Sequence, residues 1–161
     1  HAMNVLNQFS YPLIVTGVLF VVFLLLRRIA SMRVIAISEV LMALVFVAGF
    51  FALRTGEGDV ADIRDHEAII GNGRPTMIEF FSNFCTACLV LRPTVDDIIA
   101  NLGDDFNVLR VNIHSEEGQK MREAYNFSFT PEFVVLDGAG IEVWRDHAPP
   151  RLSALRALVP G

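Results

Sequence analysis

The hydrophobic pattern divides the chain into an apolar first third and a remainder in which short apolar blocks alternate with polar ones. Residues 9–26 carry no charged side chain, and residues 34–53 carry one, Glu39. Each stretch is close to the ~20 apolar residues that a helix needs to cross a bilayer core. Helices of a soluble bundle would show a polar face that repeats every ~3.6 residues, and these stretches show almost none. The pattern therefore predicts a transmembrane hairpin of two helices in residues 9–53.

The charges around these stretches predict how the hairpin is oriented. Arg27, Arg28 and Arg33 lie at the turn, and basic residues favour the cytoplasmic side of a membrane. They follow the first apolar stretch, whereas a cleavable signal peptide carries its basic residues before the apolar core. We therefore expect a multi-pass protein of the cell membrane with both termini and the soluble domain outside the cytoplasm, for example in the periplasm. Disulfide chemistry is possible in such a compartment.

Composition sets the remaining boundaries. Residues 1–8 are predicted to be a tail, of which residues 1–3 have the form of a cloning remnant that ends in a native Met. Residues 54–59 are rich in glycine and indicate a short flexible linker, and residues 60–161 form the soluble domain. The formal charge of -5, from 13 basic and 18 acidic residues, argues against a nucleic-acid partner, because phosphate binding needs a basic face.

The soluble domain shows alternating strand and helix patterns. Strand-like blocks occupy residues 75–81, 106–113, 132–137 and 141–146, and helical spacing occupies residues 65–70, 85–102, 115–125 and 151–159. Asp65 and Ser115 are candidate helix caps, and Gly138-Ala139-Gly140 indicates a hairpin between the last two strands. This order predicts an α/β fold with a mixed central sheet and helices on both faces.

Both cysteines of the chain, Cys85 and Cys88, lie at the start of the predicted helix 85–102. Three residues apart on a helix, they share one face with Cα atoms ~5–6 Å apart, within reach of a disulfide. The first cysteine lies at the positive end of the helix dipole, which can lower its pKa from ~8.5 to ~7. The spacing thus favours a redox pair in which Cys85 attacks and Cys88 resolves the mixed disulfide.

Two other uses of the pair are less favoured. A zinc site needs four ligands, and His66, His114 and His147 are not closely spaced with one another, so we expect no metal and no other cofactor. A purely structural disulfide across so short a loop would remove little chain entropy. His114 is expected to be a surface loop residue, and Phe81 and Trp144 are expected in the core.

Two segments resemble the thioredoxin superfamily, and the similarity covers roughly residues 60–160. MIEFFSNFCTACLVLRPTVDDI is similar to the active-site strand and helix, especially of membrane-anchored members that face the periplasm or thylakoid lumen. FTPEFVVLDGAGIEVWR is similar to the cis-proline loop and the terminal hairpin. The resemblance implies a thioredoxin-like fold and thiol-disulfide oxidoreductase activity, with Cys85 as nucleophile and Cys88 as resolving thiol.

The resemblance also implies roles for four further residues. Pro131 would be cis and would pack against the cysteines, and the backbone of Thr130 would align an extended substrate chain. Glu79 would be the buried acid that takes the proton from Cys88, and a solvent-facing acid at a strand edge is the alternative. Phe84 stands where thioredoxin usually has Trp and would line an apolar lip for protein docking.

Departures from the family pattern indicate the direction of electron transfer. Thr86-Ala87 replaces Gly-Pro, and neither a histidine between the cysteines nor a lysine at Leu89 stabilises the thiolate. We therefore expect a reductant of extracytoplasmic protein disulfides, as in cytochrome c maturation. A disulfide oxidase or isomerase, or a non-catalytic binding or metal-delivery module, is the alternative. Because neither apolar stretch contains cysteine, the expected electron donor is an integral-membrane thiol carrier.

Overall fold

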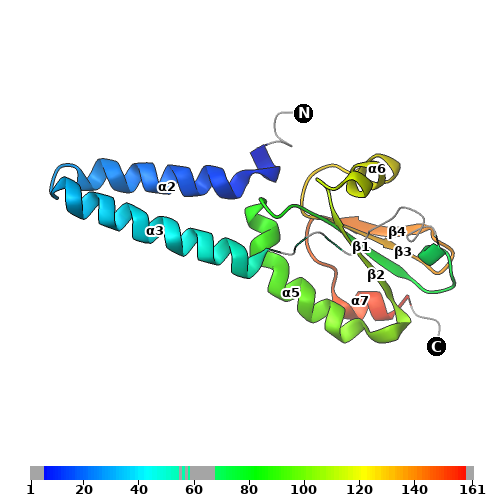
Figure 1. The fold of residues 1–161 in the computed structure, drawn as a ribbon. Helices are drawn as coiled ribbons and strands as arrows, with labels where there is room; N and C mark the ends of the chain where they lie inside the picture. Colours follow the sequence, from blue (N-terminus) through cyan, green and yellow to red (C-terminus); the bar gives the residue numbers. More distant parts are fainter. Residues whose placement is uncertain (1–5, 55, 57, 59–67, 159–161) are drawn as a thin grey trace.

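The structure is a computed structural model that describes residues 6–54, 56, 58 and 68–158. Two long helices, α2 (Ser10–Leu26) and α3 (Met32–Leu53), form an antiparallel hairpin that projects from one end of an α/β domain (Figure 1). No side chain of α2 is buried, and Ile35 is the one buried residue of α3. Much of the apolar surface of the hairpin is therefore exposed.

The helices of the hairpin differ in how well their length fits a membrane. Within the described residues, α3 is the one helix that is both long enough, at 22 residues, and apolar enough to cross a bilayer. Helix α2 is apolar but has 17 residues. At 1.5 Å per residue, α2 spans about 25 Å, slightly less than a typical hydrocarbon core. The helical hairpin that the sequence predicts is present. By length and composition, α3 could span a membrane, whereas α2 is shorter than a full span.

The sheet of the α/β domain has the order β2-β1-β3-β4. It consists of β1 (Thr76–Phe81), β2 (Asn107–Asn112), β3 (Glu132–Leu136) and β4 (Glu142–Asp146). Strand β1 pairs parallel with β2 and antiparallel with β3, which pairs antiparallel with β4. The mixed sheet predicted from the alternation of strands and helices is thus confirmed.

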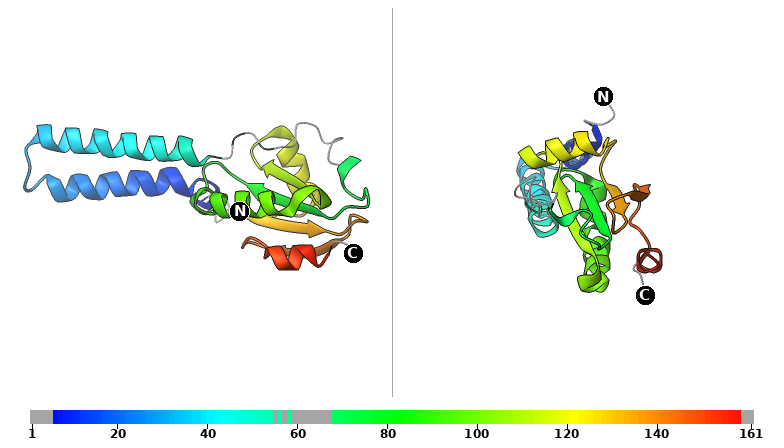
Figure 2. Two further views of the ribbon diagram at one scale, coloured as in Figure 1. Left: turned by 90° about the horizontal axis from the view of Figure 1, so that it is seen from below. Right: turned by 90° about the vertical axis from the view of Figure 1, so that its right-hand side faces the viewer.

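Helices cover both faces of the sheet (Figure 2). Helix α6 (Glu116–Ala124) contributes Met121 to a core that contains Ile78 and Phe80 of β1. The other face is covered by α5 (Thr86–Leu102), which ends in the short 3-10 helix η1 (Gly103–Asp105), and by α7 (Leu152–Arg156). There, Leu102 of α5 and Leu155 of α7 pack with Met77 of β1. Every residue of β1 is buried, so this central strand has helices above and below it.

The alternation of side chains along β1 decides what faces helix α5. Successive residues of a strand point to opposite faces, so Met77, Glu79 and Phe81 share one side. Phe81 clusters with Cys85 and Cys88, which places the cysteine pair at the end of this row. The strand therefore carries a buried carboxylate on the same face as the thiols.

Two details differ from the sequence expectations, and one expectation cannot be compared. Helix α7 ends at Arg156, short of the predicted residue 159. The described linker residues are held by the domain: Gly56 donates its N–H to Asn83 Oδ1 at 3.2 Å, and Gly58 forms a β-bridge with Val111. The linker is thus bound at these two glycines, because each meets polar groups at the edge of the sheet. The predicted cap Asp65 lies outside the described residues.

Candidate thiol-disulfide active site

The cysteine pair lies after the end of β1, at the start of α5. Cys85 is the N-cap residue of α5, and its sulfur accepts a hydrogen bond from the backbone N–H of Cys88 at 3.4 Å. This N–H belongs to the first turn, whose donors have no partner within the helix. Both cysteines are thiols and both are buried, with 0% of Cys85 and 4% of Cys88 exposed.

The two sulfurs differ strongly in acidity. The hydrogen bond from the Cys88 thiol is the main cause that lowers the pKa of Cys85 to about 6, and burial opposes it. The Thr130 side chain and the N–H groups of Cys88 and Ala87 lower the pKa further. This value lies below the ~7 expected from the helix terminus because the second thiol adds its own donor. The pKa of Cys88 is raised, chiefly by burial and then by the neighbouring Cys85 sulfur.

The loop before β3 closes one side of the pair. The Thr130–Pro131 peptide bond is cis, as predicted. The Cys85 thiol lies 3.6 Å from the carbonyl oxygen of Thr130, to which it donates when protonated. Thr130 itself is fully buried. Two residues that are 45 positions apart in the sequence thus meet at the reactive sulfur.

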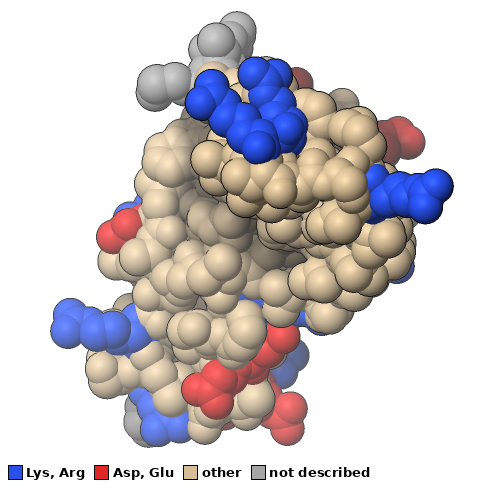
Figure 3. Space-filling view, turned by 90° about the vertical axis from the view of Figure 1, so that its left-hand side faces the viewer, with Lys and Arg blue, Asp and Glu red and all other residues tan. Residues whose placement is uncertain are grey.

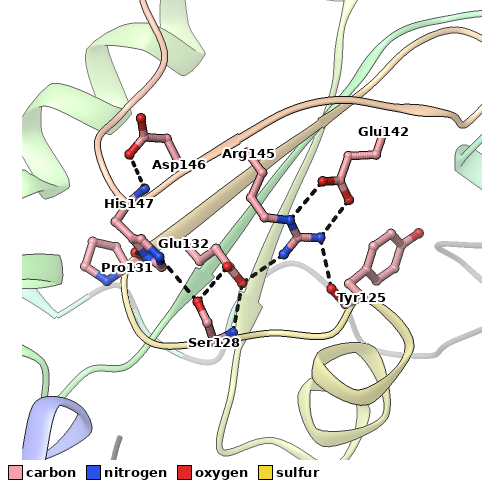
Figure 4. A network of polar contacts seen from close by, with 8 residues as sticks. All are labelled: Tyr125, Ser128, Pro131, Glu132, Glu142, Arg145, Asp146 and His147. Atoms are coloured by element: carbon pink, nitrogen blue, oxygen red, sulfur yellow. Dashed lines mark hydrogen bonds and ion pairs between the residues drawn. The ribbon is translucent and has the colours of Figure 1, made fainter. Parts of the chain in front are cut away.

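A polar network behind this loop holds it to β3 and β4 (Figure 4). His147 donates from Nδ1 to the carbonyl oxygen of Pro131 at 2.8 Å, and its ring stacks on Phe129 with centroids 3.6 Å apart. Ser128 donates to Glu132 at 2.8 Å, and Glu132 forms an ion pair with Arg145 at 3.1 Å. The sequence did not indicate this network, because its members come from two separate segments, residues 128–132 and 145–147.

Glu79 is buried, 2% exposed, as the resemblance implied. The solvent-facing alternative is therefore wrong. Its carboxylate accepts a hydrogen bond from Arg110 Nε at 2.8 Å, and Arg110 also contacts Asp96 at 2.8 Å. The negative charge of Glu79 contributes to the raised pKa of Cys88, so the two groups interact. Arg110 was not predicted as the partner of Glu79. The two residues lie opposite each other through the register of β1 on β2, which local sequence patterns do not define.

Phe84 lies beside the pair and is 40% exposed. Its ring stacks on Phe9 and on Phe50, each at 5.7 Å between centroids, so the expected apolar lip packs against the hairpin. His114 also lies here and bonds Ser82 Oγ at 3.0 Å, with its pKa lowered by burial and then by Arg122. His114 lies in the turn after β2, in agreement with the expected loop, but it is partly buried because this turn brings it over Ser82. Phe81 is fully buried, as expected.

A thiol at the start of a helix, a second thiol one turn on and a cis-proline loop form an arrangement suited to thiol-disulfide exchange. The chain belongs to the thioredoxin family, whose family model, described as Thioredoxin, matches residues 60–153. No three His, Cys, Asp or Glu side chains in the described part of the chain gather in a way that could hold a metal ion.

Two relatives carry names that refer to this chemistry or fold. A thiol:disulfide interchange protein TxlA homolog of Synechocystis is 30% identical over 74 residues, which cover 46% of this chain and 41% of the relative. A chloroplastic thioredoxin-like protein, HCF164 of Arabidopsis thaliana, is 27% identical over 117 residues, or 72% of this chain and 43% of the relative. The chain thus spans less than half the length of either relative.

The fold is also similar to that of solved thioredoxins. Mitochondrial thioredoxin 3 of Saccharomyces cerevisiae superposes with a TM-score of 0.50 at 14% identity, over 69% of this chain and 96% of that one. At this identity the similarity concerns the fold alone. The family match thus agrees with the observed fold and with the position of the cysteine pair.

Proposed function

We propose that the chain is a membrane-tethered reductase of extracytoplasmic protein disulfides, with Cys85 as the attacking thiol. The observation that carries this proposal is the acidic Cys85 sulfur, with a pKa of about 6, at the start of α5 beside the cis-proline loop. At pH 7 such a sulfur is ~90% thiolate, which is the nucleophilic form. Reduction of a protein disulfide, for example in cytochrome c maturation, uses this thiolate directly.

The reaction proceeds in two exchanges. The Cys85 thiolate attacks one sulfur of the substrate disulfide, forms a mixed disulfide and releases a substrate thiolate. Cys88 then gives its proton to the Glu79 carboxylate and attacks the Cys85 sulfur, which releases the second substrate sulfur as a thiolate. The substrate gains two electrons and the protein is left with a Cys85–Cys88 disulfide. Thr130 and Pro131 align the substrate chain, and Phe84 supports docking.

The acidity of Cys85 bears on the direction of the reaction. A low thiol pKa stabilises the reduced protein and so makes the disulfide more oxidising. A pKa of about 6 is closer to that of thioredoxin, ~7, than to that of the strong oxidant DsbA, ~3.5. This supports a reductant rather than an oxidase. A reduction potential near -120 mV, typical of DsbA, would contradict the proposed direction.

The hairpin of residues 9–53 supplies the proposed membrane anchor, with residues 54–59 as connection and residues 60–161 as the reactive domain. Its apolar side chains are exposed, and a basic group lies near its turn (Figure 3). The match to the chloroplastic relative is longer than the chain that follows α3, so it reaches into the hairpin. The lipid bilayer is then a binding partner, and an integral-membrane thiol carrier re-reduces the Cys85–Cys88 disulfide.

Trapping of the substrate tests this proposal. Replacement Cys88→Ser removes the resolving thiol, so mixed disulfides with substrate proteins should accumulate on Cys85 in cells. The matched variant Cys85→Ser should trap none, because the raised pKa of Cys88 keeps it as the unreactive thiol. Trapped proteins that normally reside in the cytoplasm, or trapping by Cys85→Ser at the same level, would overturn the proposal.

A further inference from the structure

The N-terminal segment, residues 6–11, lies across the cysteine pair. It includes the first residues of α2, and several of its polar groups bond to the α/β domain. Asn7 Oδ1 accepts hydrogen bonds from the backbone N–H of Thr130 at 3.1 Å and from its hydroxyl at 2.8 Å. The carbonyl oxygen of Gln8 accepts from Ser82 Oγ at 3.1 Å. The segment is therefore bound from both sides of the site.

Further contacts surround Cys85 itself. The N–H of Tyr11 donates to the carbonyl oxygen of Phe84 at 2.9 Å, and the N–H of Thr86 donates to Ser10 Oγ at 2.9 Å. The N-terminal segment thus forms hydrogen bonds with the backbone of both residues that flank Cys85. Cys85 lies between these two contacts and has 0% exposure.

The segment uses the group that the proposed mechanism assigns to substrate. The Thr130 N–H, beside the cis peptide bond, would bind an acceptor of an extended chain, and here it binds Asn7. Phe9 adds an aromatic contact, because its ring lies 5.7 Å from that of Phe84 and 5.3 Å from that of His114. One short peptide therefore provides both a hydrogen-bond acceptor and an aromatic ring to the site.

We propose that residues 6–11 occupy the polypeptide-binding groove as an intramolecular pseudosubstrate and close the thiol site. A substrate must displace this segment before its disulfide can reach Cys85. The substrate that does so best is an extended polypeptide with a carbonyl group for the Thr130 N–H and an aromatic side chain for the surface of Phe84 and His114. This inference rests on the proposed reductase function and adds its resting state and its substrate preference.

The segment is also linked to the hairpin. The Tyr11 hydroxyl donates to the carbonyl oxygen of Phe46 in α3 at 2.5 Å, and its ring lies 5.7 Å from that of Phe50. Phe50 in turn stacks on Phe84 beside the cysteines. Displacement of residues 6–11 therefore disturbs contacts between the first turn of α2 and the end of α3, and a partner that binds the hairpin there would favour the open site.

The rate at which iodoacetamide alkylates Cys85 tests the closure in the full chain in lipid nanodiscs. The variants are Asn7→Ala, which removes both bonds to Thr130, and Phe9→Ala, which removes the aromatic contact. Thr16→Ala is the matched control, because its exposed hydroxyl bonds Pro12 within α2. Rates are compared at the plateau of the pH profile, so that a change in thiol acidity does not imitate a change in access.

We expect Asn7→Ala to raise the plateau rate about five- to thirtyfold, since one or two hydrogen bonds no longer hold the segment closed. Phe9→Ala should raise it several-fold, and Thr16→Ala should leave it unchanged. Plateau rates within twofold of the parent chain in both Asn7→Ala and Phe9→Ala would overturn the closure. Thermal unfolding of each variant verifies that higher rates do not come from a destabilised domain.

Insulin reduction by the same variants separates the closure from the proposed function. Faster alkylation together with faster insulin reduction supports both. Faster alkylation without any insulin reduction supports closure by residues 6–11 and overturns the reductase function. A peptide disulfide with a phenylalanine beside its cysteine should be reduced faster than the same peptide with alanine there. Equal rates for the two peptides would overturn the aromatic preference.

Discussion

At the residue scale, the site depends on an asymmetry between two chemically identical side chains. Cys85 receives hydrogen bonds from the Cys88 thiol and from helix N–H groups, which stabilise its thiolate. Cys88 is buried behind it and faces the negative charges of the Cys85 sulfur and Glu79, which oppose its ionisation. The pair is thus prepared for attack by one sulfur and for a later, proton-coupled step by the other.

The pH dependence of alkylation should report this asymmetry. Only the thiolate reacts, so the rate at Cys85 should rise with pH, pass its midpoint near pH 6 and level off above pH 7. Cys88→Ala should move the midpoint upward, because it removes the strongest donor to the Cys85 sulfur. Cys88→Ser keeps a donor and should move it less. Mass spectrometry of the labelled chain would measure this, and a parent midpoint near 8.5 would contradict the assigned acidity.

Glu79 should affect both stability and the second exchange step. Glu79→Gln weakens the buried pair with Arg110 and should lower the free energy of unfolding by about 1–3 kcal/mol in urea titrations. It should also lengthen the lifetime of the mixed disulfide, because the amide cannot accept the Cys88 proton. Asp96→Asn is the control, since this second partner of Arg110 is 46% exposed and should cost less than ~1 kcal/mol. A mixed-disulfide lifetime equal to that of the parent chain would exclude Glu79 as the proton acceptor.

At the element scale, α6 shows how packing overrides helix propensity. Gly118 weakens the helical pattern of residues 115–125, yet α6 forms and is capped by Ser115, whose Oγ accepts from the Gly118 N–H at 3.0 Å. A Cβ at position 118 would lie 1.9 Å from the carbonyl oxygen of Asn112 at the end of β2. The glycine is therefore required where the helix begins directly against the sheet.

Gly118→Ala should accordingly destabilise the domain. In a solvent-exposed helix, a Gly→Ala replacement would stabilise the folded state by about 1 kcal/mol. Here the added methyl group would collide with the backbone of β2, which has no room to move. We expect the free energy of unfolding to fall by about 1–3 kcal/mol. Gln119→Ala, next to it and exposed, should change stability by less than ~0.5 kcal/mol. A stabilised Gly118→Ala variant would show that α6 can shift away from β2.

At the scale of the whole molecule, the hairpin and the thiol site lie at the same end of the α/β domain (Figure 1). Phe84 touches Phe50 of α3, and Ser10 at the start of α2 contacts Thr86 of α5. If the hairpin spans a membrane, the cysteines lie close to the membrane surface. That position suits electron transfer from an integral-membrane donor better than from a soluble one.

Reporter cysteines should reveal the topology. In a chain with Cys85→Ser and Cys88→Ser, Ala139→Cys places a thiol in the exposed β3–β4 turn, and Ile29→Cys places one in the hairpin turn, where Ile29 is 81% exposed. In intact cells, a membrane-impermeant maleimide that enters the periplasm should label Ala139→Cys and should not label Ile29→Cys. After the membrane is opened, both should react. Labelling of Ile29→Cys alone in intact cells would reverse the proposed orientation.

Local sequence patterns were sufficient for the elements and for the cysteine pair. Apolar periodicity indicated the helices and the four strands, because each pattern is set by neighbours a few residues apart. The spacing of Cys85 and Cys88 at a helix start implied the redox chemistry for the same reason. The family resemblance added the cis bond at Pro131 and the burial of Glu79, both of which the structure has.

Contacts between distant segments required the tertiary structure. Asn7 and Thr130 are 123 positions apart, and Ser82 and His114 are 32 apart, and no local pattern links either pair. The sequence by itself determined which sulfur chemistry this protein can perform, because helix position and cysteine spacing are local. Only the tertiary structure decided that residues 7–11 bond to the residues around the attacking sulfur and that the acidity of this sulfur exceeds the helix effect, because burial and hydrogen bonding depend on how the whole chain packs.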